Sequence, residues 1–246
     1  MPEVTPGART FRPPYHRPSA APRARVSSRP MDPGKVVDFV IVLAVLLFAV
    51  SFHESAHAWT ALRFGDPTAR DLGRISLNPL HHIDLFGSVL LPALLYFTSG
   101  LLFGYAKPTP VDLRNTRNPR LANLAVSGAG PASNFLLAAL GVAFLWALRR
   151  SAPAMDLRLL GPLGQVAMTI IQVNLGLAVF NLLPIPPLDG SGVLSGLLGG
   201  GVARFFAQLA PFGFLLLILL SSTGVLSRLL GPIFSMFSAI ILRVLS

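Results

Sequence analysis

The chain has 246 residues, of which 52% are hydrophobic and only 12% are charged, and its net charge is +10 at pH 7. Soluble domains carry about 25% charged residues, so this composition excludes an ordinary soluble protein and indicates an integral membrane protein. The basic residues lie in the tail and the loops without interleaved aromatic residues, which argues against a nucleic-acid partner. A helical span needs about 20 apolar residues, so the length predicts an all-α polytopic membrane protein with about five to six membrane helices.

Residues 1–34 are rich in Pro and Arg, with six Arg and no apolar periodicity. Such a segment cannot bury a core, so we predict a disordered tail. Met31 stands just before the first apolar run, which favours a native start there, with residues 1–30 as an upstream extension. The predicted organisation is this tail, a membrane core over 35–195 and a C-terminal helical hairpin over 196–246.

The first apolar run, from Val36 to about Phe64, carries the pattern His-Glu-Ser-Ala-His near its C-terminal end. Positions i and i+4 share one face of a helix, so His53 and His57 can reach one metal ion. Glu54 follows the first His directly, where it can act as a general base toward water that the metal activates. Two His on a helix are often ordinary, but ionisable residues inside a membrane segment are costly and mark function. The setting therefore favours a metal site.

The next part of the chain is predicted to be a connector with one broken apolar run. Residues 70–80 are polar with short extended character. His81 and His82 follow, and we expect solvated or helix-capping roles for both. The apolar run 85–103 is interrupted by Pro92, which is compatible with a broken path rather than one straight span.

Four further apolar runs complete the chain. Two read as full spans, and the last two read as a hydrophobic hairpin: Leu121–Leu148, Gly161–Leu183, Val202–Ser221 and Ser227–Leu245.

A catalytic zinc site needs three protein ligands and one open position. Asp189 differs from the Asp residues in loops, because it follows a long apolar span in a Pro- and Gly-rich stretch that must break the helix. Unwound backbone at membrane depth is tolerated only inside the protein or along a wet cavity, so Asp189 is a candidate third ligand. An ordinary Asp-Gly turn is an equal alternative at this point.

Three motifs together resemble the site-2 protease family of intramembrane zinc metalloproteases. They are HESAH (53–57), GAGPASN (128–134) and NLLPIPPLDG (181–190). The resemblance covers residues 36 to about 195, and GYAKPTPV (104–111) is similar to a connector of the compact branch of the family, which lacks PDZ and CBS domains.

The resemblance implies a set of site residues. The residues implied to bind one Zn²⁺ per chain are His53, His57 and Asp189. Glu54 is implied to be the catalytic base. Asn134 and Asn181 fall where the family keeps polar residues near the site, although helix packing is an alternative role for Asn134.

The positions of the two metal motifs predict the topology. Both lie near the C-terminal ends of their spans, so they reach one depth only if these spans run parallel. One full span, 121–148, lies between them, and a second crossing by 85–103 would place the motifs at opposite faces. We therefore predict that 85–103 is re-entrant or partly buried. Most loop Arg and Lys residues then fall on one side, which the positive-inside rule makes the cytoplasm, with the N-terminus outside and the C-terminus inside. A six-crossing model with the tail inside is the alternative.

The predicted function is an intramembrane zinc metalloprotease in the inner membrane of a bacterium, with its active site nearer the cytoplasmic face. Its partners are then a transmembrane protein substrate and membrane lipid. A substrate strand is predicted to pair near Gly73–Leu77.

The alternative is a membrane metal transporter or metal-binding protein that uses the same His and Asp residues. A transporter needs no Glu beside a ligand and usually shows inverted repeats, which the sequence lacks. An aspartyl protease fits poorly because Asp38 and Asp189 share no motif, and a serine protease fits poorly because no Ser nucleophile motif is paired with a His.

Overall fold

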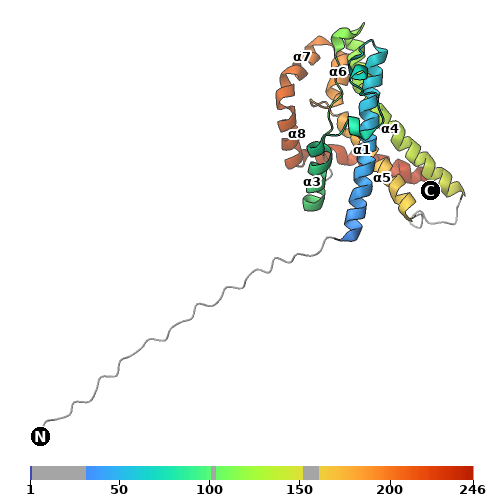
Figure 1. Cartoon of the computed structure of the whole chain (residues 1–246), viewed down its shortest axis with the longest axis vertical. Helices are drawn as coiled ribbons and strands as arrows, with labels where there is room; N and C mark the ends of the chain where they lie inside the picture. The colour runs from blue at the N-terminus through green and yellow to red at the C-terminus, as the bar shows by residue number, and fades with distance from the viewer. Residues whose placement is uncertain (2–31, 101–103, 152–160, 246) are drawn as a thin grey trace. The chain divides into compact units, whose positions relative to one another are not determined.

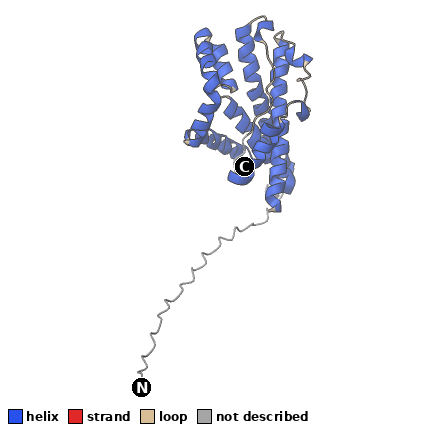
Figure 2. Ribbon diagram, turned by 60° about the vertical axis from the view of Figure 1, so that its left-hand side comes forward, coloured by secondary structure: helices blue, strands red, loops and turns tan. Residues whose placement is uncertain are grey.

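The computed structural model describes residues 1, 32–100, 104–151 and 161–245. The chain divides into two units, Met1–Asp32 and Pro33–Ser246, and the following description concerns the second unit alone. The predicted start at Met31 and nearly all of the predicted disordered tail lie outside the described residues, so both stay predictions. Within the described part of the second unit the regular elements are all helical, and Figure 2 shows no strand there.

Among the described residues, five helical stretches are long and apolar enough to cross a membrane. They are α1 (Pro33–Arg63), α4 (Pro119–Ser151), α5 (Gly161–Asn181), the consecutive helices α7 (Gly200–Leu209) and α8 (Gly213–Ser222), and α9 (Val225–Leu245). Twenty helical residues extend over about 30 Å, which is the thickness of the hydrocarbon core. The prediction of an all-α membrane protein with about five to six spans is confirmed.

The long helices α1 and α4 pack against each other in opposite directions. His53 of α1 meets Asn134 of α4, and His57, one turn further along α1, meets Val126, two turns earlier on α4. This order of contacts makes the two helices antiparallel. The C-terminal half of α1 is therefore covered by the N-terminal half of α4, as Figure 1 shows.

Helix α5 packs against both α1 and α4 and runs parallel to α1. Asp38, near the start of α1, accepts a hydrogen bond from Gln165, near the start of α5. Further along, Asn174 of α5 lies at the same level as His53 of α1, because both contact Asn134. The ends of α1 and α5 therefore lie on the same side of the bundle, as the prediction of one crossing between the two metal motifs requires.

Helix α6 (Asp189–Leu198) lies along α4 at close range, because it presents small residues to it. A Cβ atom at Gly196 would lie 2.5 Å from the Leu124 Cβ, and one at Gly192 would lie 2.1 Å from the Ser127 Oγ. Small residues four positions apart allow membrane helices to approach in this way. The packing fixes the first residue of α6, Asp189, close to α4.

The segment from Leu85 is helical but too short to cross. A π-helical turn (Leu85–Leu90) leads into α3 (Leu91–Ser99), and fifteen residues reach only about 22 Å. The chain then returns to where the segment began: the amide of Tyr105 donates to the carbonyl of Gly87 at 3.0 Å, and the Ser88 hydroxyl donates to the carbonyl of Tyr105 at 2.8 Å. These contacts agree with a re-entrant segment, and its path in the membrane stays a prediction.

A buried carboxylate joins the turn after α1 to the connector before α4. Asp66 has no exposed surface and accepts hydrogen bonds from the amide and hydroxyl of Thr68, the amide of Asp112 and the side chain of Asn115. Burial alone would raise the pKa of the Asp66 carboxyl, but the hydrogen bonds from Thr68, Asn115 and Asp112 hold its pKa below the usual value. This network also fixes the short helix α2 (Thr68–Asp71) against the end of α1.

The C-terminal helices cover the core from outside. Leu230 of α9 packs against Ala138 of α4 and against Leu175 and Val179 of α5. In Figure 1, α7 and α8 lie on the side of α6 and α3, and α9, drawn in red, runs obliquely to α1 toward the C-terminus. The division between a core ending at residue 195 and a separate C-terminal hairpin stays a prediction.

Candidate metal centre

Three side chains from α1 and α6 converge at one buried point. Nε2 of His53 lies 3.0 Å from Oδ2 of Asp189, and Nε2 of His57 lies 3.4 Å from Oδ1. One ligand atom from each of the three residues lies within 4.8 Å of the others, and both His residues are buried. The three residues predicted as metal ligands are therefore brought together, although Asp189 is more than 130 positions from the two His in the sequence.

The partners on the far side of each imidazole decide which nitrogen faces the carboxylate. Nδ1 of His57 lies 2.6 Å from the carbonyl oxygen of Val126, which can only accept, so Nδ1 carries the proton. Nδ1 of His53 lies 2.6 Å from Oδ1 of Asn134 and likewise donates to it. In the neutral imidazoles both Nε2 atoms therefore present lone pairs.

This arrangement fits a cation. Two lone pairs and a carboxylate face one another with no donor between them, and such a group is repulsive unless a positive charge lies at its centre. Among the described residues, Oδ2 of Asp189 is buried and has no hydrogen-bond partner. Two imidazoles and one carboxylate form a ligand set that zinc takes in catalytic sites, where a fourth position stays open.

A glycine makes room for the ion. A Cβ atom at Gly130 of α4 would lie 2.4 Å from Nε2 of His57 and 2.5 Å from Nε2 of His53. Only a residue without a side chain lets α4 pass this close to the two Nε2 atoms. The next residue, Pro131, lies inside the helix and removes one hydrogen bond of the α4 ladder close to Val126.

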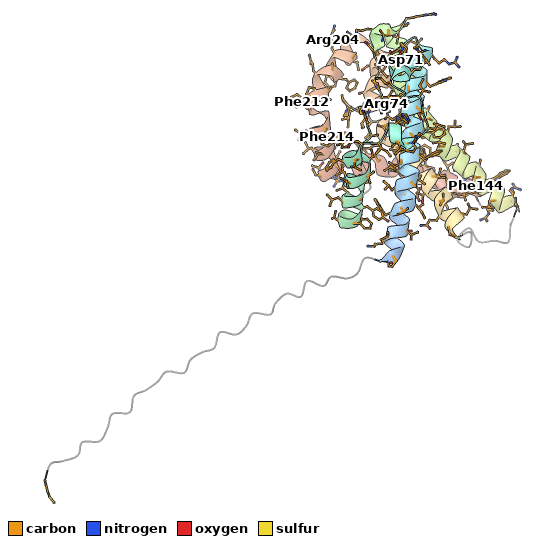
Figure 3. All side chains as sticks on the ribbon, in the orientation of Figure 1. Asp71, Arg74, Phe144, Arg204, Phe212 and Phe214 are labelled. Carbon is orange, nitrogen blue, oxygen red and sulfur yellow. The ribbon has the colours of Figure 1, made fainter. Side chains whose placement is uncertain are left out.

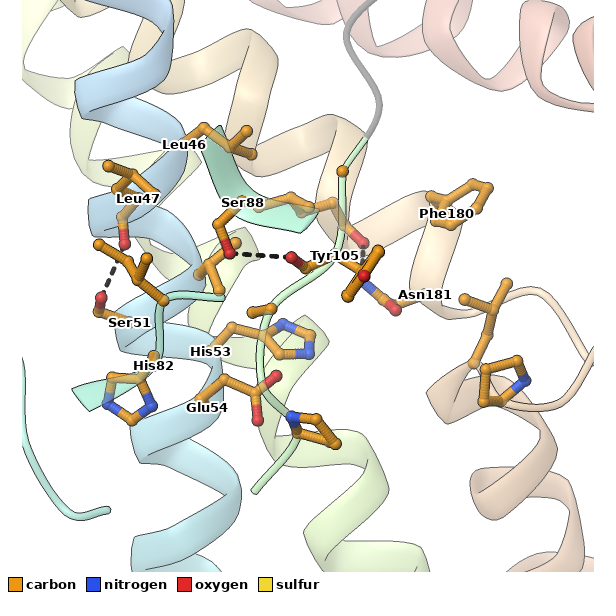
Figure 4. Close-up of a pocket in the computed structure, with 18 of the residues that line it drawn as sticks. Leu46, Leu47, Ser51, His53, Glu54, His82, Ser88, Tyr105, Phe180 and Asn181 are labelled. Atoms are coloured by element: carbon orange, nitrogen blue, oxygen red, sulfur yellow. Dashed lines mark hydrogen bonds between the residues drawn. The ribbon is translucent and has the colours of Figure 1, made fainter. Parts of the chain in front are cut away.

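Glu54 is held at the wall of a cavity by the returning limb of the re-entrant segment. The amide of Thr109 donates to Oε2 of Glu54 at 2.8 Å, and the Thr109 hydroxyl donates to the Glu54 carbonyl at 3.1 Å. Thr109 lies between Pro108 and Pro110, so its N–H is the one backbone donor of this stretch, and the residue before a proline is kept extended. Figure 4 shows His53 and Glu54 directed toward the same space.

The cavity has a volume of about 600 Å³ and a mostly apolar wall. Residues of α1, the connector, α5, the turn before α6, and α8 line it, and α4 contributes none of the lining residues. The apolar side chains that line it include Leu46, Val50, Leu177, Phe180, Phe214 and Leu217. A space of this size and character suits an apolar peptide segment.

Comparison with known proteins agrees with a metalloprotease. No family model matches the chain, and no solved structure matches it. The protein named "Putative zinc metalloprotease YwhC" from Bacillus subtilis is 36% identical over 214 residues, which cover 87% of this chain and 94% of that protein. The chain belongs to the site-2 protease family of zinc metalloproteases.

Two further relatives bear the name "Putative zinc metalloprotease Rip2". The one from Mycolicibacterium smegmatis is 34% identical and the one from Mycobacterium tuberculosis strain H37Rv is 33% identical, each over 183 residues, 74% of this chain and 66% of the relative.

Membership of the site-2 protease family identifies the ion. The relatives are named for zinc, and the His53, His57 and Asp189 group of this chain can bind a metal. The predicted cofactor, zinc, is therefore confirmed, while the individual ligand assignments rest on the geometry described above.

The two Asn residues that the resemblance placed near the zinc site have different surroundings. Asn134 is completely buried and contacts the ring of His53. Asn181 lines the cavity at the end of α5, and its Nδ2 donates to the carbonyl of Leu177 in its own helix at 3.0 Å.

Sequence reasoning missed two residues near the zinc site and misjudged the exposure of a third. Thr109 was part of a Pro-rich connector, and Asn174 was one of several polar residues in an apolar span. His82 was expected to be solvated or to cap a helix, but it is buried at 1% exposure, so the expectation of solvation is wrong. Its Nε2 lies 2.7 Å from the carbonyl of Ser76. One signal was available in the sequence: Thr109 has a Pro on each side, so its amide is the one backbone donor of this stretch.

Proposed function

We propose that the protein is an intramembrane zinc metalloprotease that hydrolyses peptide bonds in or near transmembrane helices of other membrane proteins. One observation carries this proposal: a His-His-Asp group that fits zinc lies beside a glutamate at the wall of an apolar cavity, between helices long enough to span a membrane. The metalloprotease family supports the reaction class. The position of His53 and His57 within α1, a helix long enough to span a membrane, supports cleavage at membrane depth.

The proposed roles follow from the contacts. His53, His57 and Asp189 hold the zinc ion, which when bound polarises the scissile carbonyl and makes water a stronger acid. Glu54 removes a proton from the attacking water, whose oxygen bonds to the carbonyl carbon. Glu54 then gives this proton to the amide nitrogen as the C–N bond breaks. The Thr109 amide keeps Oε2 in place, which leaves Oε1 for the proton transfer.

The cavity determines the form in which a substrate binds. A regular helix hides its peptide bonds inside its own hydrogen-bond ladder, so a transmembrane substrate has to unwind locally before a carbonyl reaches Glu54. Pairing of the unwound segment with residues near Gly73–Leu77 stays a prediction.

Two Trp–Arg pairs support a shallow position of the site in the membrane. The guanidinium of Arg63 lies 4.6 Å from the ring centre of Trp59 at the end of α1, and that of Arg150 lies 5.2 Å from Trp146 at the end of α4. Because α1 and α4 are antiparallel, the pairs lie at opposite ends, where membrane interfaces favour Trp. His53 precedes Trp59 by six residues, which places the zinc site about 9 Å below that interface.

The basic residues favour the cytoplasmic side for this interface. Seven of them lie on α1, α2, the connectors and the first turn of α4, at the end where α1 stops and α4 begins: Arg63, Arg70, Arg74, Lys107, Arg114, Arg117 and Arg120. Figure 3 shows Arg74 and Arg204 toward the same end and Phe144 toward the other. By the positive-inside rule this end faces the cytoplasm of a bacterial inner membrane.

The test of the proposal is cleavage of a model transmembrane substrate by purified protein, with the zinc content measured on every sample. Glu54→Gln should lower the rate by about 10²- to 10⁴-fold, the usual contribution of a general base, and should keep one zinc per chain. Asp38→Asn is the matched control, because it neutralises another carboxylate of α1 far from the site, and it should cleave as the unchanged protein does.

Equal cleavage by the unchanged protein and Glu54→Gln would reject the assignment of Glu54 as the base. Zinc transport into liposomes by a Glu54→Gln variant as fast as by the unchanged protein, without cleavage by either, would favour the transporter alternative.

A further inference from the structure

A chain of hydrogen bonds inside the bundle leads from α5 through α4 to His53. Nδ2 of Asn174 donates to the carbonyl of Ile170 at 2.9 Å, Oδ1 of Asn174 accepts from Nδ2 of Asn134 at 2.9 Å, and Oδ1 of Asn134 accepts from Nδ1 of His53 at 2.6 Å. Asn134 is fully buried and Asn174 is 1% exposed. Both Asn side chains are therefore shielded from solvent, and they depend on partners inside the bundle for their hydrogen bonds.

The backbone carbonyl at the far end fixes the direction of every bond in the chain. The Ile170 carbonyl can only accept, so the Asn174 amide must turn its nitrogen toward it and its oxygen toward Asn134. Asn134 must then present its nitrogen to Asn174 and its oxygen to His53. The imidazole of His53 is left with the proton on Nδ1 and the lone pair on Nε2, the atom that faces Asp189.

A second contact shows that the orientation of the Asn134 amide depends on Asn174 only in part. Nδ2 of Asn134 also lies 3.3 Å from the carbonyl of Ala49, which favours the same orientation of the Asn134 amide. The contact with Asn174 is shorter at 2.9 Å. We therefore expect a smaller loss on removing Asn174 than on removing Asn134, which touches the imidazole directly.

The two zinc-facing imidazoles differ in what holds them. His57 is oriented by a backbone carbonyl, that of Val126, which no side-chain substitution removes. His53 is oriented by side chains alone, through Asn134. A substitution on α5 can therefore change the orientation of His53, and with it the zinc affinity, although α5 supplies no proposed ligand.

We propose that Asn174 is a positioning residue of the zinc site, which acts through Asn134 to orient the imidazole of His53 so that its Nε2 faces Asp189. The inference rests on the proposed zinc ligands and adds a helix, α5, to the group of elements that set zinc affinity. Residues that orient a metal-bound His commonly change metal affinity when they are replaced.

The experiment is a zinc titration of the purified full-length apoprotein in detergent against a chromophoric chelator. Asn134→Leu should weaken zinc binding by about 10- to 100-fold, and Asn174→Leu by about 3- to 10-fold, in keeping with the usual effect of partners of a metal-bound His. Asn174→Asp should bind nearly as tightly as the unchanged protein, because a protonated carboxyl can both donate to the Ile170 carbonyl and accept from Asn134.

Gln165→Leu is the matched control for helix packing. It removes a hydrogen bond between α5 and α1, that with Asp38, without touching the chain of contacts to His53, so zinc affinity should not change. If Asn174→Leu does not fold, Asn174→Ala removes the same amide with less bulk and decides the question. A tautomer measurement by ¹⁵N chemical shifts of the His rings should show that Asn174→Leu weakens the preference for a proton on Nδ1 of His53, and that Asn134→Leu weakens it further.

The outcomes separate this inference from the proposed function. Unchanged zinc affinity and unchanged His53 tautomer in Asn174→Leu or Asn174→Ala would overturn the positioning role, as would an equal loss of affinity in Gln165→Leu. If His57→Ala binds zinc as tightly as the unchanged protein, the proposed ligand set itself is wrong.

Discussion

The helices of this protein divide into a polar-centred core and an apolar periphery. In α1, α4, α5 and α6 the buried side chains include His53, His57, Asn134, Asn174 and Ser195. In α7, α8 and α9, by contrast, the buried side chains among the described residues are all apolar, and Leu230 is the buried side chain that α9 contributes to the core.

This difference shows that the hydropathy of a helix does not predict whether the helix contributes to the zinc site. The mean hydropathy of the candidate spans is similar, 1.6 for α5 and 1.8 for α9, yet α5 carries contacts to the zinc site and α9 faces outward. What separates them is the packing of small and polar residues, since helices in lipid associate through close packing and hydrogen bonds rather than through hydrophobicity.

The largest effect is expected where α4 passes the proposed zinc ligands His53 and His57. Gly130→Ala places a methyl group against Nε2 of His53 and His57, so we expect loss of zinc and a fall in cleavage of about 10²-fold or more, as for other ångström-scale displacements at a reacting centre. Zinc content and cleavage rate are the measurements. Gly128→Ala is the control, because its added methyl group meets no atom within 4 Å, and a similar loss in that variant would contradict the steric explanation.

A second substitution tests the support of Glu54. Thr109→Pro removes the amide that donates to Oε2, and we expect cleavage to fall by about 10-fold or more with zinc retained, in the range seen for residues that orient a catalytic site. Thr109→Ala keeps this amide and loses only the hydroxyl contact, so its rate should stay within about 3-fold of the unchanged protein, the worth of one ordinary hydrogen bond. Equal rates for the two variants would show that the amide is dispensable.

The end of α1 should respond to pH through Asp66. The pKa of Asp66 is lower in the folded protein than in the unfolded chain, where an Asp titrates near about 3.9. Its contribution to stability is therefore complete above that pH and is lost as the pH falls toward the folded-state pKa. Asp66→Asn should lower the midpoint of thermal unfolding by a few degrees at pH 7 and should reduce the difference between pH 7 and pH 3.5. Asp71→Asn, which removes an exposed carboxylate, should leave both midpoints unchanged.

The periphery should show the smallest effect. Leu230→Ala removes the main contact of α9 with Ala138, Leu175 and Val179, and we expect a midpoint lower by a few degrees, as for other cavities in packed cores, with zinc content unchanged. Leu242→Ala, at a position 68% exposed, should change neither. Loss of zinc in Leu230→Ala would show that the periphery and the zinc site are more closely coupled than their packing indicates.

Much of this arrangement was predictable from local patterns. The spacing of His53 and His57 needs only a helix, and Asp189 stands out because a long span breaks before it. The re-entrant segment followed from counting crossings between the two motifs, which is a constraint on the whole chain rather than a local signal.

The supporting residues were not predictable in the same way. Asn174 is one of several polar residues in α5, with nothing in the sequence to distinguish it from Thr169 or Gln172 as the residue that contacts Asn134. Thr109 touches Glu54 across 55 positions, and no periodicity encodes that approach. Such contacts depend on how helices and connectors meet in space, which a single sequence does not specify.

The glycine at position 130 makes access to the ion one-sided. The backbone of α4 closes the face behind the two imidazoles, and the cavity opens on the face where Glu54 stands, with no lining residue from α4. Any incoming group, whether a peptide carbonyl, a chelator or a hydroxamate inhibitor, has to arrive from the front. Bulk on a ligand bound at the ion is then accommodated on the Glu54 side, where the cavity lies.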